Sequence, residues 1–168
     1  SGLTILTDPV FSKRASPFAI AGPKRLISPV ISLEDLPSID VIIVSHNHYD
    51  HLDIRSLKTL NKFNPNTLFL VAKGDKKLLI ESGIKNVEEF LWWEELKIKE
   101  TIFTFTPVQH WSARGLRDRN KSLWGGWHIK SPDNIVYHAG DTGYSQDFRE
   151  TRLKLGSPDF AMIPIGGY

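Results

Sequence analysis

Three histidines and one aspartate fall within the six residues HNHYDH at positions 46–51. A packed core has little use for so many imidazole and carboxylate groups, whereas a metal ion binds both kinds. His46 and His48 are two residues apart, so on extended backbone their rings point the same way and can share one ion. Asp50 and His51 follow at a turn and can supply ligands to a second, adjacent ion. The spacing therefore predicts a site for two metal ions.

The donor types indicate which metal this site would take. Imidazole nitrogens with carboxylate oxygens suit zinc first, and iron, manganese or nickel less well. The chain has no cysteine, which excludes thiolate ligands and disulfide bonds. A single histidine would be read as part of a solvated loop. Such a cluster directly after the apolar run Val41-Ile42-Ile43-Val44 instead indicates a metal site.

Three further candidates follow predicted strands. His110 is the favoured third imidazole, because a cluster of two needs another ligand. Asp141 has Gly140 directly before it and Gly143 two residues after it, and it could bridge two ions through its carboxylate. Asp8 precedes a proline, so it is either a turn residue or a carboxylate that orients a ligand histidine.

The two other histidines are not assigned as metal ligands. His128 lies within a predicted strand, after a pair of glycines that indicates a bulge or a close approach of backbone. His138 ends the strand before Asp141, where we expect it to pack in the core or to support a ligand.

The elements that must position these residues alternate between strand and helix. Strands are predicted at 3–7, 40–44, 67–72, 87–91, 98–108, 123–129, 135–137 and 159–165, and helices at 54–63, 75–82 and 144–155. The apolar strand at 40–44 fits burial on both faces, as in a parallel or mixed sheet between helices. Residues 102–106 fit a half-buried antiparallel strand. Asp53 is a good N-cap for the helix that follows it. The alternation predicts a layered α/β domain.

Length and composition set the broad class. The chain has 168 residues, 40% hydrophobic and 24% charged, which suits one globular core, so residues 1–168 are taken as a single domain. The formal net charge of +2 gives no general argument for a nucleic-acid or membrane partner. No apolar run approaches the roughly 18 residues of a membrane span, and no signal peptide opens the chain. A cytoplasmic or peripheral membrane location is expected.

Two loops have roles that the sequence leaves open. Residues 11–29 are rich in proline, serine and glycine with scattered aromatics, and form either a wall over a site or an irregular surface loop. Residues 112–122 carry four cations and one anion. They are either a solvated connection or a contact for phosphate, since guanidinium groups match phosphate oxygens.

Five features together resemble the metallo-β-lactamase superfamily: SHNHYDHLD at 45–53, QHW at 109–111, AGDTGY at 139–144, TDP at 7–9 and IPIGGY at 163–168. The tryptophan-rich pieces LWWEE and DRNKSLWGGW are similar to the N-acylphosphatidylethanolamine-hydrolysing phospholipase D family and its bacterial relatives. The resemblance covers essentially the whole chain. It implies an αβ/βα sandwich with a dinuclear zinc site at one edge of the two sheets.

The resemblance also implies a role for each candidate ligand. One zinc is held by His46, His48 and His110, the other by Asp50 and His51, with Asp141 bridging and Asp8 in support. The family's last ligand, a histidine further along, has no counterpart before Tyr168. We therefore expect a sandwich incomplete at both ends, a fragment lacking the C-terminal part, and a second zinc site that is weak or empty.

Paired zinc ions predict hydrolysis. Zinc lowers the pKa of bound water to about 7, and paired ions stabilise charge on the attacking and leaving oxygens of a phosphodiester. Asp50 could orient the hydroxide or accept its proton, and Asp141 would act beside it as the bridge. The expected substrate is a small-molecule or lipid phosphodiester, with the N-acylphosphatidylethanolamine type suggested by the resemblance alone.

Other functions and partners stay open. A lactonase or thioesterase would use the same hydroxide on a carbonyl, and an inactive metal-binding fragment is a further alternative. Peripheral membrane contact and a homodimer are both compatible with the sequence. Nucleic acid is not expected as a partner, because the basic residues are concentrated in one loop rather than spread along a stripe.

Overall fold

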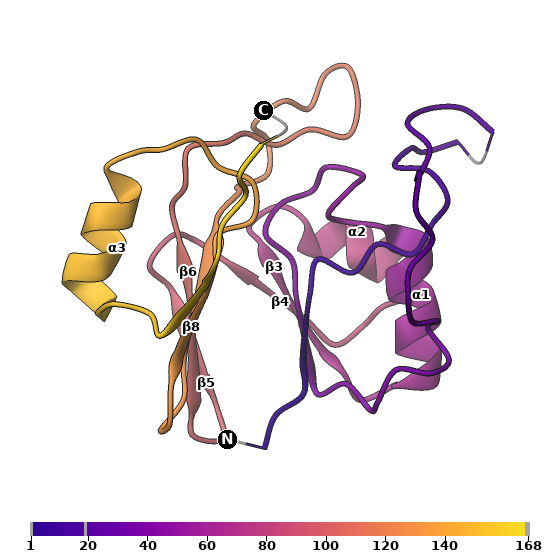
Figure 1. Cartoon of the computed structure of the whole chain (residues 1–168). Coiled ribbons are helices and arrows are strands. Elements are labelled where there is room, and N and C mark those ends of the chain that lie inside the picture. Colours follow the sequence, from indigo (N-terminus) through magenta and orange to yellow (C-terminus); the bar gives the residue numbers. More distant parts are fainter. Residues whose placement is uncertain (1, 19, 167–168) are drawn as a thin grey trace.

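Two β-sheets face each other, and helices cover their outer faces, in a computed structural model that describes residues 2–18 and 20–166 (Figure 1). The layers run helix, sheet, sheet, helix along the molecule. This arrangement confirms the αβ/βα sandwich that the family resemblance implies. Within the described ranges, no helix is both long and apolar enough to cross a bilayer.

The first sheet carries the segment that leads to the histidine cluster. Its strand order is β1-β2-β3-β4, and every pair is parallel. The strands are β1 (Ile5–Thr7), β2 (Val41–Ile43), β3 (Leu68–Ala72) and β4 (Val87–Phe90), with helices α1 (Ile54–Phe63) and α2 (Lys76–Glu81) on the outer face. Because parallel strands end at the same edge, the loops after β1 and β2 meet there.

The second sheet brings the remaining candidate residues to that edge. Its order is β5-β6-β7-β8-β9, antiparallel except for the last pair. The strands are β5 (Glu95–Ile98), β6 (Thr101–Thr106), β7 (Gly126–Lys130), β8 (Ile135–His138) and β9 (Phe160–Met162), and helix α3 (Asp147–Leu155) covers the outer face. The loops that follow β6 and β8 carry His110 and Asp141.

The side chains of β2 alternate between two apolar cores. Val41 and Ile43 pack in the core between the sheets, and Ile42 and Val44 pack in the core under α1 and α2. The prediction that this strand is buried on both faces is confirmed. Trp127 of the second sheet donates from Nε1 to the Val44 carbonyl at 3.0 Å, which joins the sheets just before the histidine cluster begins.

Two expectations for the second sheet are wrong. The strand expected over 98–108 is shorter, because Ile98 ends β5 and Lys99 turns the chain into β6 at a φ of 52°, without the glycine or proline that usually marks a turn. The half-buried pattern expected for 102–106 is also wrong. Four of these five residues are buried, because Phe103 and Phe105 enter the core between the sheets while Thr104 and Thr106 are covered on the opposite face.

The glycine pair before His128 marks a close approach of backbone, one of the two outcomes expected for it. A Cβ atom at Gly125 would lie 2.4 Å from the Thr106 carbonyl oxygen, so only glycine fits between β6 and β7. The Gly125 amide also donates to the Ser45 carbonyl at 2.9 Å, directly before His46.

Candidate metal centre

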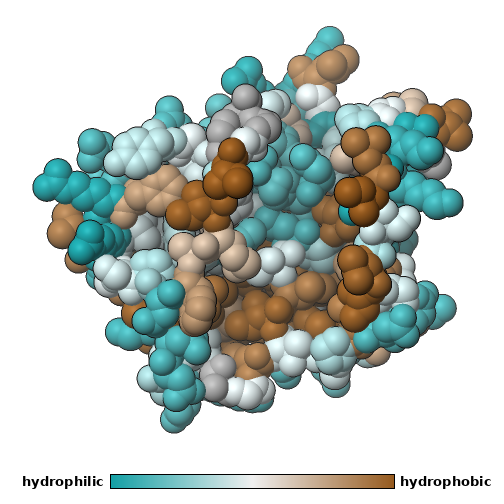
Figure 2. Space-filling view, viewed as in Figure 1, coloured by the Kyte–Doolittle hydropathy of each residue, from teal (hydrophilic) through white to brown (hydrophobic). Residues whose placement is uncertain are grey.

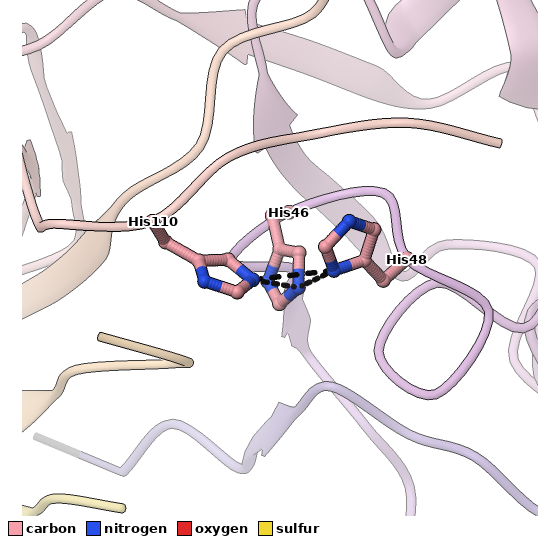
Figure 3. A group of neighbouring side chains, drawn as sticks. All are labelled: His46, His48 and His110. Atoms are coloured by element: carbon pink, nitrogen blue, oxygen red, sulfur yellow. Dashed lines mark hydrogen bonds between the residues drawn. The ribbon is translucent and has the colours of Figure 1, made fainter. Parts of the chain in front are cut away.

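Three imidazole rings converge at the edge where β2 and β6 end. His46 Nε2 lies 2.9 Å from His48 Nδ1, and His110 Nε2 lies 3.2 Å from both atoms (Figure 3). Ligand nitrogens around a tetrahedral zinc, each about 2.0–2.1 Å from the ion, are about 3.3 Å apart. The three rings therefore present one nitrogen each at nearly the separation that a single ion requires.

The electrostatic surroundings keep these rings in their metal-binding form. The pKa of His46 is lowered to about 2, first by burial and then by the neighbouring His51. Burial is also the main cause of the lowered pKa of His48 and of His110. Neutral imidazole is the form that binds a metal, so no proton has to be displaced from these three rings near neutral pH.

Asp141 faces this group and a second one. His46, His51 and Asp141 bring ligand atoms within 4.8 Å of one another. Asp141 Oδ1 lies 3.3 Å from His51 Nε2, and its Oδ2 lies 3.8 Å from His110 Nε2. The hydrogen bond with His51 is the main reason why the pKa of Asp141 is lowered. An ionised carboxylate between two clusters of nitrogens has the position that a bridging ligand needs.

The structure places Asp50 at the mouth of the site, outside both ligand groups of the described residues. Its exposed side chain lines a cavity of about 600 Å³ with His48, His110 and Trp111. It also lines a neighbouring cavity of about 340 Å³. The structure thus brings all six predicted ligands to one edge and gathers five of them into the two groups.

Asp8 accepts four hydrogen bonds behind the site. Its Oδ1 accepts from the Ser45 amide at 2.7 Å, and its Oδ2 accepts from Ser45 Oγ at 2.7 Å and from His51 Nδ1 and His138 Nε2 at 2.8 Å. Burial alone would raise the pKa of Asp8, but the bonds from His138 and His51 hold it well below its usual value. The carboxylate orients His51 so that Nε2 faces Asp141.

The two remaining histidines have different surroundings. His138 lies at the end of β8 and shares the Asp8 carboxylate with His51. His128 is buried on β7, outside both ligand groups, and burial lowers its pKa. His138 thus lies beside a ligand, and His128 lies in the framework.

Sequence reasoning missed the part that Arg114 plays. Its Nη1 donates to the carbonyl of Asn47 at 2.7 Å and to that of Leu52 at 2.8 Å, and its guanidinium lies 4.0 Å from the centre of the Tyr49 ring. These two carbonyls stand before and after the segment that contains three of the candidate ligands. Arg114 therefore fixes the ligand loop from 62 to 67 residues away, and the sequence signals only a cation-rich loop.

Asp75 lies buried behind the same loop, where Oδ1 accepts from Asn47 Nδ2 at 3.0 Å. Burial raises its pKa to about 6, although hydrogen bonds from Ser122 and Asn47 and the charge of Arg114 act in the opposite direction. When the pKa of a carboxyl group is higher in the folded state, ionising the group costs more free energy in the folded chain than in the unfolded chain. Its ionisation therefore destabilises the fold as the pH rises from about 4 to above 6.

We expect Asp75→Asn to become more stable relative to the parent chain as the pH rises, because asparagine keeps an acceptor for Asn47 and does not titrate. The difference in free energy of unfolding should grow by about 1–1.5 kcal/mol between pH 5 and pH 7.5. Urea unfolding of both chains at both pH values measures it. A difference that does not change with pH would contradict the raised pKa.

Comparison with known proteins places the chain in a family. Residues 4–168 match the family model of the beta-lactamase superfamily domain. The chain is 41% identical over 177 residues to N-acyl-phosphatidylethanolamine-hydrolyzing phospholipase D 1 of Caenorhabditis elegans, covering 99% of the chain and 50% of that protein. It is 41% identical over 179 residues to the mitochondrial N-acyl-phosphatidylethanolamine-hydrolyzing phospholipase D of Saccharomyces cerevisiae, covering 100% of the chain and 37% of that protein.

The fold is shared with solved structures at lower identity. The crystal structure of a possible metal-dependent hydrolase from Veillonella parvula superposes with a TM-score of 0.74 at 21% identity, covering 96% of this chain and 64% of that one. The chain spans half the length, or less, of the two curated relatives above. Because the family model covers nearly all of its residues, the chain belongs to the beta-lactamase superfamily, as a relative of the N-acylphosphatidylethanolamine-hydrolysing phospholipases D.

Proposed function

We propose that residues 1–168 act as one metal-dependent hydrolase domain that binds zinc and cleaves a phosphodiester. The observation that carries the proposal is the convergence of His46, His48 and His110, with Asp141 between them and His51. Bound zinc would lower the pKa of coordinated water to about 7 and stabilise negative charge on phosphoryl oxygens.

Each candidate residue has a distinct part in this proposal. His46, His48 and His110 would hold the first ion, and His51, with Asp50 approaching from the mouth, would hold a weaker second one. Asp141 would contact both. The exposed Asp50 carboxylate faces the 600 Å³ cavity, where it can orient the attacking water and accept its proton. Asp8 keeps Nδ1 of His51 occupied, which leaves Nε2 free to act as a ligand.

A lipid phosphodiester fits the surroundings of this cavity. The two relatives that are 41% identical carry names that specify N-acylphosphatidylethanolamine hydrolysis. The half-exposed Trp111 lines the cavity and offers an apolar wall, and Lys24 and Arg25 line the neighbouring cavity that shares Asp50. An apolar wall and nearby cations suit a substrate with acyl chains and a phosphate. We propose this class of substrate on these grounds.

Zinc-loaded protein is expected to hydrolyse N-acylphosphatidylethanolamine at least tenfold faster than a homoserine lactone or a glutathione thioester, because paired ions stabilise charge on both oxygens of a phosphodiester. Chromatographic measurement of released N-acylethanolamine, with parallel assays of the other two substrates, tests this. Removal of metal with a chelator should abolish turnover, and added zinc should restore it. Hydrolysis of lactone or thioester with the phosphodiester left intact would replace this proposal by the alternative function.

A further inference from the structure

The three imidazoles that would hold the first ion come from both sheets. His46 and His48 follow the end of β2, and His110 follows the end of β6. Figure 2 shows hydrophobic side chains gathered between the sheets, and hydrophilic ones above them toward the edge that carries the metal centre. Hydrogen bonds beyond the strands therefore have to set the distance between the two ligand segments. The sequence Trp-Gly-Gly-Trp at 124–127, which leads into β7, supplies such bonds to both segments.

Two residues of the Trp-Gly-Gly-Trp segment hold the chain directly before His46. Trp127 Nε1 donates to the Val44 carbonyl at 3.0 Å, and the Gly125 amide donates to the Ser45 carbonyl at 2.9 Å. These carbonyls belong to the two residues that precede the first ligand. The two bonds therefore fix the point at which the ligand loop leaves the first sheet.

The first tryptophan of the segment holds the chain before His110. Trp124 Nε1 donates to the Val108 carbonyl at 3.0 Å, and the His110 amide donates to the same oxygen at 3.1 Å, which closes a three-residue turn. A carbonyl oxygen has two lone pairs, and here both are engaged, so the orientation of this peptide group is fixed. The indole of Trp124 thereby sets the turn that leads to His110.

Trp124 is itself held by the turn between β4 and β5. Trp92 Nε1 donates to the Trp124 carbonyl at 2.6 Å, and the two rings meet edge to face with 5.6 Å between their centres. Because the second tryptophan fixes the first, little further ordering is needed for the indole to reach Val108. The two tryptophan-rich pieces of the sequence thus meet beside the metal centre.

The other side of the His110 segment is bound within its own sheet. The Gln109 amide donates to Oγ1 of the buried Thr142 at 3.2 Å, and the Gly143 amide donates to the Gln109 carbonyl at 2.9 Å. These bonds hold the segment against the loop that follows β8. They relate His110 to the second sheet, whereas the segment that contains Trp124 relates it to the first.

We propose that Trp124 is a positioning residue, which sets His110 at the distance from His46 that a shared metal ion requires. The two Nε2 atoms lie 3.2 Å apart. Because Trp124 and the adjacent Gly125 bond to the two ligand segments, a shift of the indole changes their separation directly. A misplacement of about 1 Å can lower a rate about a hundredfold. The proposal rests on the proposed function in one respect, since it takes His110 as a ligand of the first zinc ion.

Trp124→Phe tests this role, because it removes the indole N–H and keeps an aromatic ring against Trp92. We expect the affinity for the first zinc ion to fall by about 10–100-fold, the usual cost of losing a group that orients a ligand. Competition with a chromophoric chelator measures it. Cobalt(II) accepts the same kinds of ligand, and its visible absorption depends on their number and arrangement. The spectrum of the cobalt-loaded variant should differ in shape from that of the parent chain, which a loss of stability by itself would not cause.

Trp92→Phe provides a second variant on the same path. It removes the bond that holds Trp124, and Trp92 is 36% exposed, so the fold tolerates the smaller ring. We expect zinc affinity to fall in the same direction but by less, about threefold to tenfold, because the indole of Trp124 keeps its bond to Val108. Unchanged zinc affinity in both variants would overturn the proposal.

Trp93→Phe is the matched control. Trp93 lies beside Trp92 in the turn, but its ring lies 4.2 Å from Nζ of Lys154 on α3. The control loses the same part of an indole as Trp124→Phe, and it should keep both the zinc affinity and the cobalt spectrum of the parent chain. Thermal unfolding of the metal-free chains checks that each variant folds. An equal loss of zinc affinity in the control would overturn the proposal, because the effect would then come from aromatic packing in general.

The metal measurements are independent of turnover. Weaker zinc binding by Trp124→Phe, in a chain that hydrolyses no phosphodiester, would support the positioning role and overturn the proposed substrate. Phosphodiester hydrolysis by the parent chain, with zinc affinity and cobalt spectrum unchanged in Trp124→Phe, would do the reverse. In an active chain, the kcat of Trp124→Phe should fall by about tenfold or more while KM stays within about twofold, because Trp124 places a ligand and does not contact the substrate.

Discussion

Replacing His48 with alanine is expected to remove the first metal ion and to lower the hydrolytic rate roughly a thousandfold, because a bound ion supplies several kcal/mol of charge stabilisation. His48 Nδ1 is one of three ring nitrogens that lie 2.9–3.2 Å apart. Two imidazoles without the third leave an ion with too few protein ligands to compete with water. Metal content of the chain purified without chelators, measured by mass spectrometry, tests the loss directly.

His128→Gln is the matched control for this substitution. His128 is as buried as the proposed ligand His46 but lies on β7 outside both candidate groups, so its replacement should leave the metal content unchanged. A content close to two zinc ions per parent chain would show that the second site also binds zinc. A content close to one would show that only the first site does. A parent chain without metal, or a His48→Ala chain with as much metal as the parent, would contradict the proposed centre.

The sequence predicts the placement of those site residues whose orientation depends only on their position in one strand or helix or at its end. A spacing of two residues on extended backbone sets His46 and His48 to one side, and the structure brings their ring nitrogens to 2.9 Å. The ends of β6 and β8, which lie on either side of β7, bring His110 and Asp141 to the same edge. Asp53 caps α1 through a bond from the Arg55 amide at 3.2 Å, as its place before the helix predicts.

The parts that the sequence does not reveal depend on pairings between distant segments. Arg114 binds two carbonyls of the ligand loop, and nothing in the composition of its own loop specifies them. Asp50 belongs to the motif, but its side chain turns to the mouth of the site because the loop bends after His48, where the amides of His51 and Leu52 both bond to the His48 carbonyl. Spacing predicts the direction of a side chain inside a regular helix or strand, whereas the direction of a side chain in a turn has to be taken from the structure.

Asp8 gives the second large expected effect, because four donors depend on its carboxylate. In Asp8→Ala, the Ser45 amide and hydroxyl and the rings of His51 and His138 lose a buried, charged acceptor. We expect the free energy of unfolding of the metal-free chain to fall by about 3–5 kcal/mol, the usual cost of removing one partner from a buried charged pair. Urea unfolding with chelator present measures this change.

The same substitution should also weaken zinc binding by about 10–100-fold, because His51 loses the group that orients it. Asp40→Ala is the control. The Asp40 carboxylate also accepts a hydrogen bond from a backbone amide, that of Thr4 at 2.8 Å, and so also links the segments of β1 and β2. Asp40 is exposed, however, and lies at the end of these strands away from the metal centre. This substitution should cost only about 0.5–1.5 kcal/mol and leave zinc affinity unchanged. Asp8→Ala with stability lowered but zinc affinity intact would limit Asp8 to joining β1 to the loop after β2. A loss of both would mean that the bonds that hold these two segments together also build the metal centre.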